Sequence, residues 1–222
     1  MKIIAHIYSD FKEKFGIPRQ SGLAENITGK IVFEKKYRNI DALRGLDEFS
    51  HIWLLWKFSK TEREYWSPTV RPPLLGGNKR MGVFATRSPF RPNPIGLSCV
   101  KFERIELTKD EGPVIFVSGI DILDGTPIYD IKPYLPYADA NPDATAGFTE
   151  NLSERKLEIK ISDEKFYDLP DKIKQEITEI LALDPRPSYK DDNNSYGMRF
   201  SDFDIKFIVS GKELEIISIE KS

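Results

Sequence analysis

Short stretches in which apolar and polar residues alternate dominate the first two thirds of the chain. Alternation of this kind is typical of a strand with one buried face. Clusters of Gly, Pro, Asp and Asn, which favour turns, separate these stretches. The spacing predicts a barrel or sandwich of short strands rather than alternating strands and helices. The predicted strands are Ile3–Ser9, Gly29–Tyr37, His51–Phe58, Met81–Arg87, Leu97–Leu107, Pro113–Asp121 and Thr126–Tyr134.

The pattern changes after residue 138. Residues 139–147 are small and polar and lack periodicity, which is typical of a linker. Farther on, isoleucines recur at helical spacing between Pro170 and Pro185, and two alternating stretches around Gly211-Lys212 predict a hairpin. The sequence therefore predicts a mainly β N-terminal domain (1–138), a linker (139–154) and a small α+β C-terminal domain (155–222).

Composition narrows the class of protein. The 222 residues are 40% hydrophobic and 12% aromatic, which is enough for a packed core. The single cysteine, Cys99, excludes an internal disulfide and a zinc site built on cysteines, and its strand-like neighbours predict an inert, buried thiol. With two histidines in the chain, a histidine-rich metal site is not expected. No apolar stretch approaches the roughly 20 residues of a membrane helix. We expect a soluble cytoplasmic protein with no metal and no membrane association.

A stiff basic loop, Gly82–Gly96, is the first candidate for chemistry. Its three prolines fix the backbone, and Arg87 and Arg91 suit recognition of carboxylate or phosphate. Residues 65–102 contain six Lys or Arg and no Asp or Glu, although the whole chain has 33 basic and 35 acidic residues. Local charge of this kind indicates a site for an anionic partner. If that partner is RNA, the expected phosphate contacts are Arg71, Lys79, Arg80 and Arg91.

A second candidate site follows the turn Asp124–Pro127. Downstream of this turn Asp130, Lys132 and Tyr134 alternate, so a strand would place all three polar groups on one face. Such a face next to a tight turn is a candidate wall of an active site. The alternative is a solvated barrel face with an Asp–Lys ion pair.

A third stiff loop, Phe15–Gly22, carries Arg19 and Gln20. By itself this loop is typical of an ordinary connection between strands. Three stiff polar loops at the rims of a barrel, however, are placed to converge on one pocket.

His51 and two tryptophans lie on the third predicted strand. His51 suits either a general base or a strand-end imidazole with a backbone partner, and the absence of a companion carboxylate at fixed spacing favours the structural role. Trp53 and Trp56 are expected to be a core and an interface aromatic, respectively.

The three loops, together with Leu46–Trp53, closely resemble the TrmO family, also called YaeB or TsaA-like, of S-adenosylmethionine-dependent tRNA methyltransferases. The resemblance covers Ile3–Asp139 densely and continues at Asp184–Tyr189. It implies a single-sheet β-barrel and a homodimer with the cofactor near the subunit interface. It also implies methyl transfer to the exocyclic nitrogen of N6-threonylcarbamoyladenosine, the modified base next to the anticodon of certain tRNAs.

Matching the family's motifs to this sequence gives two sets of residues. The cofactor contacts implied are Gln20, Ser21, Gly22, Phe58, Ser59, Arg87, Leu97, Asp124, Gly125, Thr126 and Pro127. The active-site residues implied are Tyr37, Arg87, Arg91, Asn93, Asp130, Lys132 and Tyr134. We expect Asp130 to accept the proton that leaves the nitrogen, and Lys132 to orient the carbonyl or carboxylate of the modification.

Two other functions stay open at this point. The same barrel and cofactor would also suit another RNA position or a small-molecule acceptor. A non-catalytic β-barrel that binds RNA is the alternative from a different class. The acidic turn and Asp130 favour an enzyme, because carboxylates on a binding face repel the RNA backbone.

Overall fold

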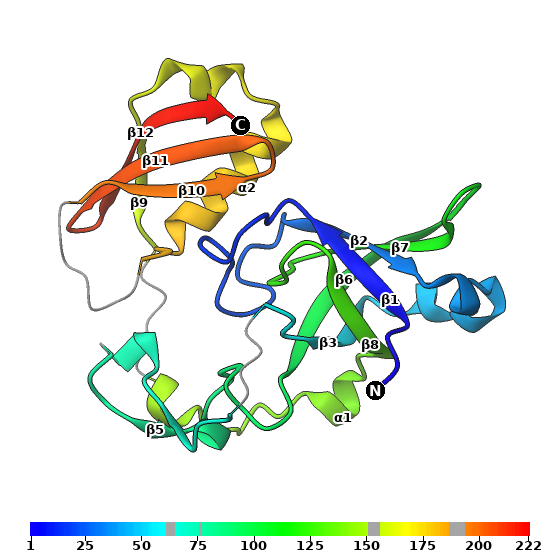
Figure 1. Ribbon diagram of the computed structural model, residues 1–222. Coiled ribbons are helices and arrows are strands. Elements are labelled where there is room, and N and C mark those ends of the chain that lie inside the picture. Colours follow the sequence, from blue (N-terminus) through cyan, green and yellow to red (C-terminus); the bar gives the residue numbers. More distant parts are fainter. Residues whose placement is uncertain (61–64, 76, 151–155, 187–193) are drawn as a thin grey trace.

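The computed structural model describes residues 1–60, 65–75, 77–150, 156–186 and 194–222. Two β structures follow one another along the chain, a closed six-stranded barrel and a four-stranded sheet (Figure 1). The fold class predicted from the sequence, a mainly β barrel followed by a small α+β unit, is confirmed. The division at residues 138 and 155 stays a prediction.

The barrel closes through antiparallel pairs in the order β1-β2-β7-β6-β3-β8. Closure leaves no unpaired edge on which another chain could build a sheet. The strands are β1 (Ala5–Ser9), β2 (Thr28–Phe33), β3 (His51–Lys57), β6 (Ile95–Thr108), β7 (Gly112–Ser118) and β8 (Thr126–Pro133).

Strand β3 shows how the sequence separates the core from the outer face. Ile52, Leu54 and Trp56 are at most 7% exposed, while Trp53 and Leu55 between them remain partly exposed. Each fully buried large apolar side chain contributes about 1.5–3 kcal/mol. The inward positions therefore fix the register of β3, and the outward positions are free for other contacts.

The predicted strand Met81–Arg87 is wrong. Only β5 (Met81–Gly82) is extended, and it pairs with β4 (Thr69–Val70) in a separate two-stranded ribbon. A 3₁₀ turn over Val83–Ala85 follows, in which the Thr86 hydroxyl donates to the Val83 carbonyl at 2.8 Å. Local hydrogen bonding of this kind competes with strand pairing.

Two further predicted strands end earlier than expected. Strand β2 stops at Phe33 and leads to a 3₁₀ helix at Lys35–Tyr37. Strand β7 stops at Ser118, because Gly119 adopts a φ of 72° that a strand does not allow. Asp121 therefore lies in a loop rather than on a strand.

The C-terminal unit is a sheet in the order β10-β11-β12-β9, in which β9 is parallel to β12 and the other pairs are antiparallel. Helix α2 lies between this sheet and the barrel (Figure 1), where its Lys172 donates to Thr28 of β2. The predicted hairpin is present as β11 and β12. The elements of the C-terminal unit are β9 (Glu158–Ile161), α2 (Asp171–Ala182), β10 (Tyr196–Phe200), β11 (Phe203–Ser210) and β12 (Glu213–Lys221). The short helix α1 (Pro136–Asp139) follows β8 of the barrel.

The two units pack through the loop between β1 and β2. Phe15 stacks on Tyr196 and Phe207 with ring centroids 6.3 Å from each. Gly16 is so close to Met198 that a Cβ there would overlap the thioether. The C-terminal sheet thus holds a loop of the barrel in place.

One carboxylate is buried at this junction. Glu176, on α2, is 0% exposed, and among the described residues neither oxygen has a hydrogen-bond partner with good geometry. Lys172 Nζ is 3.6 Å from Oε1 and also donates to Thr28 Oγ1 at 2.9 Å. Burial raises the pKa of Glu176 to about 7, and Asp10 raises it further while Lys172 lowers it.

We predict that Glu176→Gln stabilises the protein at pH 8. Since the pKa in the folded state lies above that in the unfolded state, ionisation of Glu176 lowers the free energy of unfolding as the pH rises from about 4.5 through 7. The gain should be on the order of 2 kcal/mol at pH 8 and should vanish at pH 4. Thermal unfolding at both pH values measures it, with the exposed Glu213→Gln as control. An equal effect at both pH values would contradict the assignment to charge.

Candidate functional site

A cavity of about 640 Å³ opens where one rim of the barrel meets three loops. Its size lies within the usual range of small-molecule sites. The loops are the three that the sequence predicted to converge: the one before β2, the basic loop before β6, and the acidic loop before β8. The lining residues are Lys14, Ile17, Pro18, Arg19, Gln20, Trp56, Lys57, Phe58, Ser59, Lys60, Arg87, Pro89, Arg91, Asn93, Ile95, Gly96, Leu97, Asp121, Leu123 and Thr126.

Trp56 forms the floor at the end of β3. Its indole lies against Gly96, its partner in the register of β3 and β6, where any Cβ would overlap the ring. The ring also packs on Phe58, with centroids 4.3 Å apart, and Nε1 donates to Ser98 Oγ at 2.9 Å. Trp56 is 7% exposed, so the expectation that Trp53 is the core aromatic and Trp56 the interface aromatic is wrong.

Asp121 brings an acidic group to the cavity. Its Oδ1 accepts a hydrogen bond of 2.6 Å from Ser98 Oγ, which is itself fully buried. Burial raises the pKa of Asp121 to about 6, while the bond from Ser98 and the positive charge of Arg87 lower it. The carboxylate therefore titrates closer to neutral pH than an ordinary aspartate.

The predicted cofactor loop, Gln20 to Gly22, is fixed to the barrel. Gly22 N donates to the Gly119 carbonyl at 2.8 Å, and Ser21 Oγ accepts from Cys99 N at 3.1 Å. Of the three residues only Gln20 lines the cavity, where its Oε1 accepts from Arg87 Nη1. Ser21 and Gly22 thus hold the loop, and Gln20 presents its amide.

The basic loop is stiffened by hydrogen bonds as well as by its prolines. Arg91 Nη1 donates to the carbonyls of Thr86 at 2.9 Å and of Ser88 at 3.3 Å, and its guanidinium lies 5.9 Å from the centre of the Phe84 ring. Arg87, Arg91 and Asn93 all line the cavity. This loop therefore brings three of the predicted site residues to one side of the cavity.

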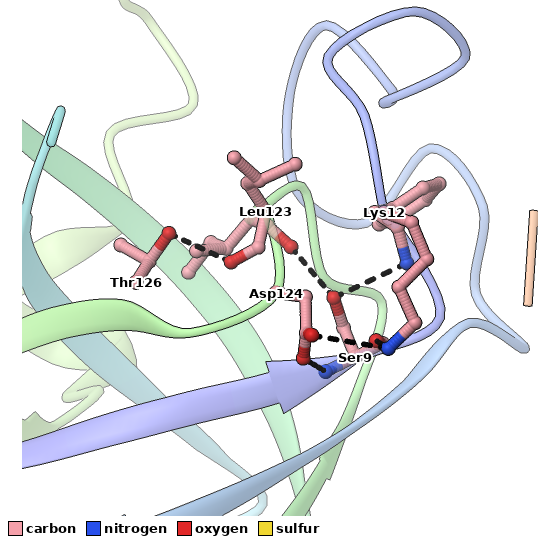
Figure 2. A network of polar contacts seen from close by, with 7 residues as sticks. Ser9, Lys12, Leu123, Asp124 and Thr126 are labelled. Carbon is pink, nitrogen blue, oxygen red and sulfur yellow. Dashed lines mark hydrogen bonds and ion pairs between the residues drawn. The ribbon is translucent and has the colours of Figure 1, made fainter. Parts of the chain in front are cut away.

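The acidic turn Asp124–Pro127 is held in place by contacts with Ser9 and Lys12 and by a local hydrogen bond from Thr126. Figure 2 shows Asp124 accepting from Ser9 N at 2.9 Å and pairing with Lys12 Nζ at 3.0 Å. Thr126 Oγ1 donates to the Leu123 carbonyl at 2.7 Å, and within this turn Thr126 alone lines the cavity. Because both carboxylate oxygens of Asp124 have protein partners, its contact with a cofactor stays a prediction, as do those of Gly125 and Pro127.

Asp130, Lys132 and Tyr134 lie on the outer face of the barrel rather than in the cavity. Asp130 Oδ2 pairs with Lys132 Nζ at 2.9 Å, and the side chains are 46% and 61% exposed. Tyr134 lies beside Trp53 and His51, with ring centroids 5.9 and 6.3 Å away. The predicted alternation on one face is present. The Asp–Lys pair expected for a solvated barrel face also forms, and the role of this face as a wall of the active site stays a prediction.

The other predicted residues lie apart from the cavity lining. Tyr37 ends a 3₁₀ helix after β2 and packs against the core. Arg71, Lys79 and Arg80 belong to the segment of β4 and β5, where Arg80 Nη1 donates to Thr69 Oγ1 at 2.9 Å. Across the ranges that the structure describes, no three His, Cys, Asp or Glu side chains group as metal ligands, and no helix is both long and apolar enough to span a bilayer.

Comparison with known proteins identifies the family. Residues 6–140 match the tRNA-methyltransferase O N-terminal domain, and residues 154–222 match the TrmO C-terminal domain. The chain belongs to the tRNA-methyltransferase O family. A tRNA (adenine(37)-N6)-methyltransferase from Escherichia coli (strain K12) is 41% identical over 226 residues, which cover 98% of this chain and 96% of that protein.

Two proteins from Pseudomonas aeruginosa extend the comparison. One carries the name of an S-adenosylmethionine-dependent methyltransferase and is 40% identical over 211 residues, 91% of this chain and 89% of its own. The other is a crystal structure of TrmO, with a TM-score of 0.77 and 34% identity, covering 98% of this chain and 97% of its own. The resemblance found in the sequence motifs is therefore confirmed.

Sequence reasoning missed several cavity residues of this TrmO family member. Lys57 and Lys60 flank the predicted Phe58 and Ser59, and Asp121 was assigned to a strand. The turn-forming sequence near these positions indicates an acidic group, but it points to Asp124 more strongly than to Asp121. In the structure Asp124 is bonded to Ser9 and Lys12, which lie more than 100 positions earlier in the chain. These contacts distinguish Asp124 from Asp121.

We predict that Gly96→Ala displaces the Trp56 indole and damages the cavity. Overpacking of this kind costs about 1–3 kcal/mol, and S-adenosylmethionine should bind at least about tenfold more weakly. Thermal unfolding and titration calorimetry measure the two effects. Gly82→Ala is the matched control, because a Cβ there meets open space and φ is −58°. Equal behaviour of the two variants would refute the role of the Trp56–Gly96 contact.

Proposed function

We propose that the protein is a cytoplasmic, S-adenosylmethionine-dependent tRNA methyltransferase. Its acceptor is the N6 nitrogen of N6-threonylcarbamoyladenosine at position 37 of tRNA. The observation that carries the proposal is one cavity bounded by apolar rings, arginines and a carboxylate, in a chain of the tRNA-methyltransferase O family. The name of the Escherichia coli relative supports adenine 37 as the acceptor.

The cavity fits the cofactor in size and in chemistry. Trp56, Phe58 and Leu97 offer apolar surface for an adenine ring, and Arg87 suits the carboxylate of the amino-acid part. When bound, S-adenosylmethionine supplies an electrophilic methyl group on a sulfonium. Gln20, Phe58, Ser59, Arg87, Leu97 and Thr126 are the predicted cofactor residues that line this space.

The outer face of the barrel that carries Asp130 and Lys132 lies next to the cavity. Leu97 pairs with Leu55 across β3 and β6, and Leu55 pairs with Asp130 across β3 and β8. With strands spaced about 4.8 Å apart, the backbones of Leu97 and Asp130 are separated by about 10 Å. A nucleotide base placed over this face would lie between the cavity mouth and the Asp130–Lys132 pair.

Positioning should supply much of the rate in this arrangement. The N6 nitrogen is a weak nucleophile, because its lone pair is delocalised into the ring and a urea-like carbonyl. Asp130 accepts the departing proton, and Lys132 orients the carbonyl or carboxylate of the modification. Arg91 and Asn93, at the edge of the cavity, complete the contacts to the acceptor.

We also propose that the active form is a homodimer with the cofactor near the interface. Leu97 is 51% exposed at the cavity mouth, and the outer face of β3 adds Trp53 and Leu55. A second copy over this apolar face would enclose the base.

Nucleoside analysis tests the proposed reaction. The purified protein is incubated with S-adenosylmethionine and bulk tRNA from cells that lack the homologue, and the digested nucleosides are separated and weighed. We expect one methyl mass on threonylcarbamoyladenosine. Methyl on another nucleoside would overturn the acceptor. No methylation, together with no thermal stabilisation by the cofactor, would favour a non-catalytic RNA-binding barrel.

We predict that Asp130→Asn lowers turnover by about 100-fold or more, since loss of a general base costs roughly 10²–10⁴. Cofactor affinity should stay unchanged, because Asp130 lies outside the cavity lining. Single-turnover methylation and calorimetry measure the two quantities. Asp110→Asn, on the turn between β6 and β7, is the control. Near-full turnover of Asp130→Asn would exclude it as the base.

The segment of β4 and β5 combines cations with exposed rings. Trp66 and Phe84, exposed by 49% and 71%, stack with centroids 6.0 Å apart in the same segment as Lys79 and Arg80. Cations beside exposed rings suit a single-stranded RNA loop. Arg71 and Arg91 extend the positive surface.

We predict that combining Lys79→Ala with Arg80→Ala weakens tRNA binding at every salt concentration. Two lost phosphate contacts should reduce the slope of log affinity against log salt by about 1.5. Filter binding over a salt series measures this slope. Lys109→Ala is the control, since the β6–β7 turn projects away from β5 in the view of Figure 1. An unchanged slope would refute these phosphate contacts.

A further inference from the structure

The charges that line the cavity are strongly unequal. Among the described lining residues, Asp121 is the one carboxylate, set against six cations. These cations are Lys14, Arg19, Lys57, Lys60, Arg87 and Arg91. Such a surface would attract an anion if Asp121 were neutral. A single carboxylate in it creates one place where a cationic group is favoured.

A chain of hydrogen bonds holds Asp121 as an acceptor. Trp56 Nε1 can only donate, and it donates to Ser98 Oγ at 2.9 Å. The Ser98 hydroxyl therefore directs its own proton to Asp121 Oδ1, at 2.6 Å. Ser98 is 0% and Trp56 7% exposed, so neither can turn to water instead. The chain presents the carboxylate in a fixed orientation beside the cavity.

The protein itself compensates this carboxylate only in part. Partial burial raises the pKa of Asp121 to about 6 despite the bond from Ser98. Arg87 contributes its charge, but its Nη1 donates to Gln20 Oε1. Backbone hydrogen bonds from Ser21 and from Asp121 itself also lower the pKa of Asp121. Among the described residues no Lys or Arg forms an ion pair with Asp121, whereas Lys12 pairs with Asp124 at 3.0 Å.

We propose that Asp121 is a cofactor-binding residue that accepts a hydrogen bond from the α-ammonium group of S-adenosylmethionine. The inference rests on the proposed function, because it assigns one contact within that site. Arg87 and Asp121 then recognise the two ends of one zwitterion, the carboxylate and the ammonium. The sulfonium and the adenosine are the alternative contacts for Asp121, and the test separates them from the ammonium.

Three ligands distinguish the groups. S-adenosylmethionine has both the ammonium and the sulfonium, S-adenosylhomocysteine keeps only the ammonium, and 5′-methylthioadenosine has neither. We expect Asp121→Asn to weaken the first two by a similar factor, about 10- to 100-fold, and to leave the third unchanged, as measured by calorimetry. Asp110→Asn should bind all three like the wild type.

Any other pattern of affinities of Asp121→Asn for the three ligands overturns the proposal. Weaker binding of S-adenosylmethionine alone would assign Asp121 to the sulfonium. Weaker binding of all three by a folded variant would assign it to the adenosine or to the shape of the cavity. Unchanged binding of all three would exclude any contact. If the wild type binds none of the three, the proposed function itself fails, which is a different result.

The wild-type protein provides a second measurement that does not depend on a variant folding. The other charged side chains that line the cavity are the cations of Lys and Arg, and the α-ammonium of the ligand is protonated below pH 7. Binding below pH 6 must therefore displace a proton from Asp121. S-adenosylmethionine should bind about tenfold more weakly at pH 5 than at pH 7, while 5′-methylthioadenosine changes little. The same pH dependence for both ligands would overturn the proposal.

Discussion

The contact between the Trp56 indole and the Gly96 backbone sets the geometry on which the site depends. It lies one residue pair before the end of the ladder between β3 and β6, which ends with Lys57 and Ile95. The Trp56 ring packs directly on the Gly96 backbone and closes the end of the barrel core. Phe58 and Leu97 lie beyond this contact and form walls of the cavity. A barrel of this size is filled by its own side chains. A ligand site must therefore be built at the rim, from the loops that leave the strands.

The outer face of the barrel offers a place for a different kind of ligand. The cavity is recessed in the rim of the barrel and has both apolar and charged walls, whereas the face of β3 and β8 is exposed and carries the Asp130–Lys132 pair. Leu97 belongs to both, as a lining residue of the cavity and as an outward residue of β6. This shared position lets a small cofactor and a large acceptor approach one another from two sides without competing for the same surface.

Sequence patterns predicted those features of the fold that depend on interactions between residues close in the sequence. Alternation located the six barrel strands, and the proline-rich loop was correctly placed at the cavity. The prediction of a strand at Met81–Arg87 was wrong because the Thr86 hydroxyl donates to the Val83 carbonyl within a local turn. The alternation of apolar and polar residues contains no information about this hydrogen bond. The turn chemistry in the sequence favoured Asp124 over Asp121 as the acidic group of the site. Their roles depend on partners supplied by other strands: Ser98 from β6 for the first, and Ser9 with Lys12 for the second.

The C-terminal unit has a structural reason to accompany the barrel. The loop that carries Arg19 and Gln20 into the cavity is held from behind by that unit. Arg19 Nη2 donates to the Arg186 carbonyl at 3.0 Å, and Ser201 N donates to the Asp10 carbonyl at 2.9 Å. Desolvation at this contact lowers the pKa of Arg19, an effect that the charge of Asp184 opposes. A loop that is ordered before binding loses less entropy on binding, so this packing would favour the affinity of a ligand in the cavity. The described residues that line the cavity all belong to the barrel and its loops, so the C-terminal unit would act through this loop.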